Sequence, residues 1–126
     1  SEKSSTFVSD VVCFNAAKVA EDLKAKAIIG LTVSGYTAFK TSSYRTNCPI
    51  YIFSSERHIL GTLNLVWGVH AYYYDKMTST DETIEDVANI LKENQKVKKG
   101  DLIVNTGSMP IHAKLRTNML KVTEVS

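Results

Sequence analysis

The sequence predicts an α/β fold: a three-layer α/β/α sandwich around a five-stranded, mostly parallel sheet whose last strand is antiparallel. Short apolar runs alternate with segments of helical periodicity between residues 11 and 105, which is the pattern of repeated strand–helix–strand units. Several of these runs are continuously apolar, as expected for strands covered on both faces. No helical segment separates the last two expected strands, so the final one should run antiparallel to its neighbour.

The elements follow one another with short, polar connections. Glycine, proline, serine and charged residues mark most of the boundaries between them. In chain order we expect a helix at 11–26, a strand at 27–31, a helix at 36–45, a strand at 50–53, a helix at 56–66, a strand at 69–74, a helix opened by Ser79, a strand at 102–105, a long loop at 106–118 and a strand at 119–125.

Capping residues and apolar faces define the helices. Ser9 or Asp10 is expected to cap the first helix and Ser54 or Ser55 the third, while Ser79 opens a capping box before the fourth. The side chains expected to face the core are Val12, Ala16, Val19, Ala20 and Leu23 in the first helix, Ala38 and Phe39 in the second, Leu60, Leu63 and Trp67 in the third, and Ile84, Val87, Ala88 and Leu91 in the fourth.

The composition fits a single domain. The chain has 126 residues, 44% of them hydrophobic, which is enough for one core and too little for two domains. We interpret residues 1–8 as a polar lead-in from a preceding domain and residues 9–126 as the domain itself.

A formal net charge of +2 gives no support to nucleic acid or membrane as a partner, and no apolar run approaches the ~20 residues of a membrane span. Cys13 and Cys48 lack metal-binding spacing, which predicts buried free thiols and a cytoplasmic protein.

The stretch AIIGLTVSGYT, residues 27–37, carries the clearest functional signal. A strand ends in a turn rich in hydroxyl groups, and a helix follows. The free N–H groups of such a turn and the positive end of the helix form an anion site. Thr32, Ser34 and Thr37 add hydroxyl donors, and Gly35 lets the backbone approach closely. This predicts a phosphate-binding site on a surface turn, with the alternative that Ser34 only caps the helix.

No catalytic or metal site is predicted. None of the three histidines, His58, His70 and His112, has another histidine or a cysteine at metal-ligand spacing. No Walker, dinucleotide-binding, esterase or zinc-peptidase motif is present. The long loop before the last strand is expected to be functional, because it carries His112, Lys114 and Arg116 with little apolar content. The residues alone indicate a binder of small anions rather than an enzyme.

Two family resemblances fit such a phosphate-binding turn. The segment TVSGYT, residues 32–37, is similar to the phosphate loop of flavodoxins, and Trp67 or the tyrosines at 72–74 are candidates to stack on FMN. Flavodoxins, however, open with the strand that feeds this loop, whereas a helix precedes it here.

The second resemblance covers nearly the whole chain. A helix followed by AKAIIGLTVSGYTA resembles the strand and effector loop of the C-terminal domain of bacterial pyruvate kinases. The remaining matches are Ser43-Tyr44-Arg45 before Cys48-Pro49-Ile50, Lys99-Gly100-Asp101 before a strand, and Thr117-Asn118 before the last strand. Together these pieces, in order and at the right spacing, are specific. The family fold, a five-stranded three-layer sandwich with an antiparallel last strand, agrees with the independent prediction above.

This resemblance implies a place in glycolysis. Pyruvate kinase transfers a phosphoryl group from phosphoenolpyruvate to ADP with Mg²⁺ and usually K⁺, at sites in a (β/α)8 barrel and a lid domain. Neither of those domains is matched here, so this chain is expected to be inactive alone and to need no cofactor. The resemblance also implies that it binds a phosphorylated sugar or nucleotide activator, contacts its own barrel domain and joins the subunits of a homotetramer.

Carried over residue by residue, the effector phosphate site is Thr32, Val33, Ser34, Gly35, Tyr36 and Thr37, with His112, Lys114 and Arg116 in the effector loop. Val33 and Tyr36 stand where many relatives carry charged side chains, so the anchoring cation of those relatives has no match here. The loop also lacks the glycine-rich, Trp- and Arg-bearing form of relatives that bind a bisphosphate. Its Pro110-Ile111 resembles bacterial relatives that answer to sugar monophosphates or AMP, which favours a monophosphate.

Overall fold

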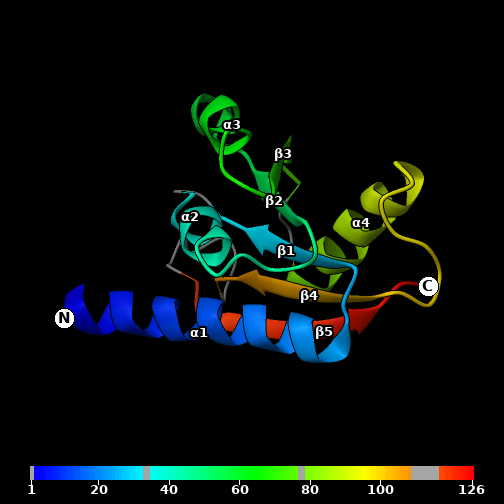
Figure 1. Ribbon diagram of the computed structural model, residues 1–126. Coiled ribbons are helices and arrows are strands. Elements are labelled where there is room, and N and C mark those ends of the chain that lie inside the picture. Colours follow the sequence, from blue (N-terminus) through cyan, green and yellow to red (C-terminus); the bar gives the residue numbers. More distant parts are fainter. Residues whose placement is uncertain (1, 33–34, 77–78, 109–116) are drawn as a thin grey trace.

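The computed structural model describes residues 2–32, 35–76, 79–108 and 117–126, with helices on both faces of one sheet (Figure 1). The sheet has the strand order β3-β2-β1-β4-β5, in which all neighbours are parallel except β4 and β5. The predicted fold class and the antiparallel last strand are confirmed. The elements are α1 (Glu2–Leu23), β1 (Ala27–Leu31), α2 (Tyr36–Ser42), β2 (Ile50–Ser54), α3 (Arg57–Leu63), β3 (Val69–Tyr73), α4 (Thr80–Glu93), β4 (Leu102–Gly107) and β5 (Met119–Glu124).

The path of the chain decides which helices cover which face. From β1 the chain steps to β2 and β3, and it then returns past β1 to reach β4 through α4. Because crossovers between parallel strands are right-handed, this reversal puts α2 and α3 on one face and α4 on the other. Helix α1 packs beside α2 on the first face.

Alternate side chains of β1 feed two separate hydrophobic clusters. Ile28 packs on the α1–α3 face with buried residues such as Ala38 and Leu63. Ile29 packs on the α4 face with Leu91 and Phe53. The strand is buried along its whole length, which explains its continuously apolar sequence.

Helix α1 is longer than predicted. It begins at Glu2, well before the predicted start, so Ser9 and Asp10 lie inside the helix and do not cap it. The additional turns project past the carboxyl ends of β1 and β4 (Figure 1). Phe7 and Val8 in these turns are 67% and 47% exposed. The apolar periodicity of a helix reports burial against the core, so it could not detect turns whose apolar side chains are exposed.

Three side chains predicted to face the core lie on the surface instead. Leu23, Phe39 and Trp67 are each about half exposed. Trp67 misses the core because α3 already ends at Leu63. Its ring is covered by the Arg45 guanidinium, 4.7 Å from the ring centroid, which is a cation–π contact.

The helix caps agree with the sequence in α4 and differ in α3. The Ser79 hydroxyl accepts a hydrogen bond from the Glu82 N–H at 3.2 Å, as predicted. Helix α3 instead begins after Glu56, with no side-chain cap. Ser54 is the last residue of β2, and its hydroxyl accepts from the Glu56 N–H at 3.1 Å, so it stabilises the turn before the helix.

Candidate functional site

The carboxyl ends of β1 and β4 form a switch point of the sheet. The connection after β1 leads to β2 on one side, whereas β4 lies on the other side of β1 and leads to β5. Ligands of open α/β sheets bind in the crevice outside such a point. The two segments predicted to bind an anion begin here: the 32–37 turn follows β1, and the long loop follows β4. Gly107, at the end of β4, packs closely on Leu31, because a Cβ added there would lie 3.2 Å from the Leu31 Cβ.

Gly35 gives the 32–37 turn its shape. It is the N-cap residue of α2 and has a φ of 83°, in the left-handed region that glycine tolerates best. Its N–H donates to the Thr32 hydroxyl at 3.2 Å. Helix α2 has only seven residues, so the hydroxyl and amide donors of the turn, rather than a long helix, must provide most of any anion affinity.

Thr37 differs from the expectation of a surface residue. It is buried, and its hydroxyl hydrogen-bonds the hydroxyl of Thr117, which is also buried. These residues are 80 positions apart, so one contact joins the 32–37 turn to the end of the loop that follows β4. One residue of each predicted binding segment, Thr37 and Thr117, therefore lies at one place, although Thr37 itself has less freedom to contact a ligand than the sequence suggested.

Tyr36 is turned toward α1. Its hydroxyl donates to the Asp10 carboxylate at 2.6 Å, and the Lys40 ammonium lies 3.9 Å from the other oxygen of that carboxylate. Asp10 of α1 thus lies beside the N-terminal end of α2. Sequence reasoning missed Asp10 and Lys40 in this role, because a contact between residues 26 positions apart leaves no local signal.

Several predicted site residues lie outside the described part of the chain: Val33, Ser34, Pro110, Ile111, His112, Lys114 and Arg116. The other two histidines are exposed, and the His70 ring stacks on Tyr51 with centroids 5.4 Å apart. Over residues 2–32, 35–76, 79–108 and 117–126, no three His, Cys, Asp or Glu side chains are grouped so as to hold a metal ion. Within these same ranges, none of the helices has the length and apolar content needed to cross a bilayer.

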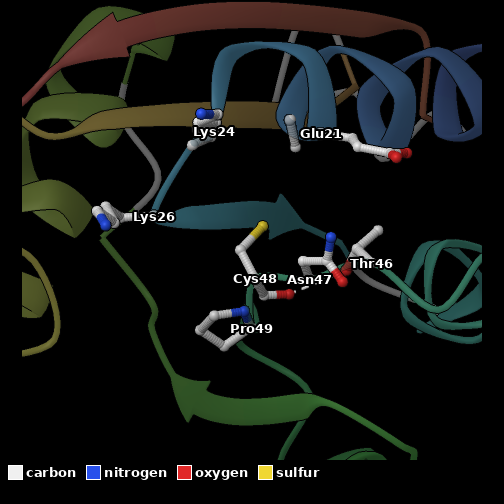
Figure 2. A pocket seen from close by; sticks show the side chains of 9 residues that line it. Glu21, Lys24, Lys26, Thr46, Asn47, Cys48 and Pro49 are labelled. Carbon is white, nitrogen blue, oxygen red and sulfur yellow. Dashed lines mark hydrogen bonds between the residues drawn. The ribbon is translucent and has the colours of Figure 1, made fainter.

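A second hollow lies at the opposite end of the sheet, where β1 and β2 begin (Figure 2). Its volume is about 290 Å³, and Lys24, Lys26, Cys48 and Pro49 are part of its lining. Burial raises the pKa of the Cys48 thiol, which keeps it protonated and weakly nucleophilic at neutral pH. Cys13 is buried in α1, and its pKa is raised for the same reason. Both cysteines are free, as predicted, but only Cys13 is fully buried, whereas Cys48 is partly exposed.

Comparisons with known sequences match this chain to pyruvate kinases. The family model described as pyruvate kinase, alpha/beta domain, matches residues 10–123. The pyruvate kinase of Clostridium acetobutylicum is 39% identical over 124 residues, which are 98% of this chain and 26% of that protein. The pyruvate kinase of Geobacillus stearothermophilus is 32% identical over 125 residues, 99% of this chain and 21% of that protein. The chain therefore spans about a quarter or less of the length of these relatives.

Solved structures share the fold. A crystal structure of a pyruvate kinase from Cryptosporidium parvum matches 94% of this chain with a TM-score of 0.84 and 23% identity, over 23% of its own length. Cryptosporidium parvum pyruvate kinase in complex with ADP matches the same share with a TM-score of 0.85, over 24% of its length. At this identity the similarity shows the common fold alone.

Proposed function

Because this chain belongs to the pyruvate kinase family and spans its alpha/beta domain, we propose that it regulates a pyruvate kinase and joins its subunits. The reaction, phosphoryl transfer from phosphoenolpyruvate to ADP with Mg²⁺ and K⁺, belongs in this proposal to a barrel domain outside this chain. The chain alone is then inactive, which a coupled assay on the purified chain checks. In the assembled cytoplasmic enzyme it contacts its own barrel domain within a homotetramer.

The proposed ligand is a phosphorylated sugar or nucleotide, bound in the crevice at the ends of β1 and β4. The hydrogen bond between Thr37 and Thr117 carries this proposal, because it joins the 32–37 turn to the loop after β4. The phosphate would accept hydrogen bonds from the hydroxyls of Thr32 and Ser34 and from the turn's amides. A monophosphate is favoured, because Asp10 places a negative charge beside the start of α2 and already pairs with Lys40. The loop residues proposed to contact the sugar or nucleoside are His112, Lys114 and Arg116.

Thermal unfolding with added ligand tests this proposal. The chain should melt several degrees higher with one of glucose 6-phosphate, ribose 5-phosphate, AMP or fructose 1,6-bisphosphate, because a ligand at about 100 times its Kd stabilises a fold by ~2.7 kcal/mol. Ser34→Ala should lose most of that shift, since one charge-assisted hydrogen bond contributes about 1.5–3 kcal/mol. Thr37 stays intact in this test, because replacing it would leave the buried Thr117 hydroxyl without its partner.

The matched control is Ser43→Ala, the same substitution at the other end of α2. The Ser43 side chain is exposed, and its hydroxyl donates to the Lys40 carbonyl at 2.6 Å. This variant should respond to ligand as the wild type does. If no compound shifts the wild-type midpoint, or if both variants respond equally, the 32–37 turn does not bind phosphate.

The proposed subunit interface uses α1 and β5. Phe7, Val11 and Phe14 are exposed on α1, and β5 is an edge strand of the sheet. Exposed apolar side chains and an unpaired strand edge both favour association with another copy. Without the barrel domain we expect only a monomer or a weak dimer, measured by light scattering over a concentration series. A tetramer that persists on dilution would contradict this expectation.

A flavodoxin-like role is not proposed. The flavodoxin sheet has the order 2-1-3-4-5, whereas this sheet has the order 3-2-1-4-5 with an antiparallel last strand. The pyruvate kinase family model also accounts for nearly the whole chain. The similarity of the 32–37 turn to a flavin phosphate loop is therefore local, and FMN is not expected to bind.

A further inference from the structure

A hollow lined by lysines lies at the end of the sheet opposite the candidate site. Figure 1 shows that α4 ends at the side of the sheet on which β1 and β4 begin. There Lys26, Lys92, Lys96, Lys98 and Asp101 take part in lining a hollow of about 400 Å³. We call it the lysine hollow. Three separate segments build it: the start of β1, the end of α4 and the turn before β4.

The positive charge of the lysine hollow is only partly compensated. Its lining includes four lysines and one aspartate, and the Asp101 carboxylate is already used by the turn, where its Oδ2 accepts from the Lys98 N–H at 2.9 Å. Lys92 donates to the backbone oxygen of Ser126, the last residue of the chain, at 2.7 Å, which leaves Lys26, Lys96 and Lys98. Between described residues, the lysine–carboxylate ion pairs involve Lys18, Lys40 and Lys121 and none of the lysines of this hollow.

The neighbouring hollow of Figure 2 carries mixed charge. It shares Lys26 and is also lined by Lys24 and by the carboxylate of Glu21. The whole chain has a formal net charge of only +2, so these lysines represent a local excess rather than a generally basic surface. Helix α4 ends at Glu93, so Lys92 lies in its last turn and Lys96 in the turn that follows, and both line the hollow. A bound anion would relieve the repulsion between like charges gathered there.

We propose that the lysine hollow binds a small anion that carries a chain of two or more phosphate groups. Lysine presents a point charge, which suits phosphate oxygens without fixing one geometry. A concave site lined by one sign of charge concentrates its field on the ligand. Lys26, Lys96 and Lys98 carry more charge than a single phosphate needs, whereas a diphosphate or triphosphate chain can contact several of them. The volume also falls within the ~300–1,000 Å³ of small-ligand sites. The proposal is independent of the activator site at the switch point.

Calorimetric titration with tripolyphosphate, ATP and orthophosphate tests whether the lysine hollow binds a phosphate chain. Tripolyphosphate should bind more tightly than orthophosphate, and the affinity should fall between about 0.05 M and 0.5 M salt, because the site is exposed to screening ions. Lys96→Gln/Lys98→Gln should weaken tripolyphosphate binding by about tenfold or more, as expected for two charges near the anion. Equal affinity for ATP and tripolyphosphate would place all the recognition in the phosphates, whereas tighter ATP binding would add a nucleoside contact.

The matched control is Lys18→Gln/Lys121→Gln, which removes the same charge at two ion-paired lysines outside the hollow. It should bind tripolyphosphate within about twofold of the wild type, and backbone amide shifts on binding should map to residues 95–101 rather than 32–37. All the replaced lysines are exposed, so both variants should melt as the wild type does. The proposal is overturned if tripolyphosphate does not bind, if the control loses as much affinity, or if an oligoglutamate of equal charge binds as tightly.

Discussion

Replacing Phe53 by alanine is expected to lower the free energy of unfolding by about 3–5 kcal/mol. Phe53 lies on β2, an inner strand of the sheet, and is fully buried. Its ring stacks on Tyr72 with centroids 5.1 Å apart and meets the edge of Tyr74 at 6.0 Å. Truncation would remove these contacts and leave a cavity under α4. Domains of this size have a free energy of unfolding of only about 5–15 kcal/mol, so this single change should remove a large part of it.

Urea unfolding followed by circular dichroism measures this effect. The midpoint should fall by about 2 M, given typical urea dependences of about 1–3 kcal/mol per M. The matched control is Phe39→Ala on α2, where the ring is half exposed and the loss should stay within about 0.5 kcal/mol. A loss below about 1 kcal/mol for Phe53→Ala would show that the ring does not fill this core.

Gly35→Ala should destabilise the chain by about 2–4 kcal/mol and abolish the ligand-induced shift in melting. The φ of 83° puts Gly35 in the left-handed region, which costs about 1–2 kcal/mol for other residues. The new Cβ would also lie 3.1 Å from the Leu63 Cδ2, and Leu63 is fully buried, which adds overpacking of about 1–3 kcal/mol. The same strain would displace the amide that binds Thr32 and so reshape the 32–37 turn.

Gly68→Ala separates the two causes. Gly68 has a φ of 72°, but no atom lies within 4 Å of an added Cβ. Its replacement should therefore cost only the backbone strain, about 1–2 kcal/mol, and leave ligand binding unchanged. Equal losses of stability in the two variants would mean that Leu63 does not confine position 35.

Periodicity predicted the helices well where one face packs on the sheet and poorly elsewhere. In α4, Ile84, Val87 and Leu91 are buried as predicted, because their spacing follows the face that covers β1 and β4. Phe39 and Trp67 were wrongly expected inside. Residue type alone does not decide burial, since folded proteins expose much of their apolar surface. The first turns of α1 were missed for the same physical reason, because their apolar side chains Phe7 and Val8 are exposed.

The candidate site was predictable only in its local part. Thr32 and Gly35 could be recognised from the residue types of a turn between a strand and a helix. The burial of Thr37 and the contact between Tyr36 and Asp10 could not, because each depends on a partner far away in the sequence. The lysine hollow is a similar case, since its lysines are contributed by three separate segments.

The sequence by itself determined the alternation of helices and strands, the α/β class and the antiparallel last strand, because periodicity and loop length are local properties of the chain. Only the tertiary structure decided that β1 lies between β2 and β4. That order brings the turn after β1 against the end of the loop after β4, and it gathers the lysines at the other end of the sheet. Contacts of this kind depend on how strands pair across long sequence separations, and the residues that make them carry no local sign of their partners.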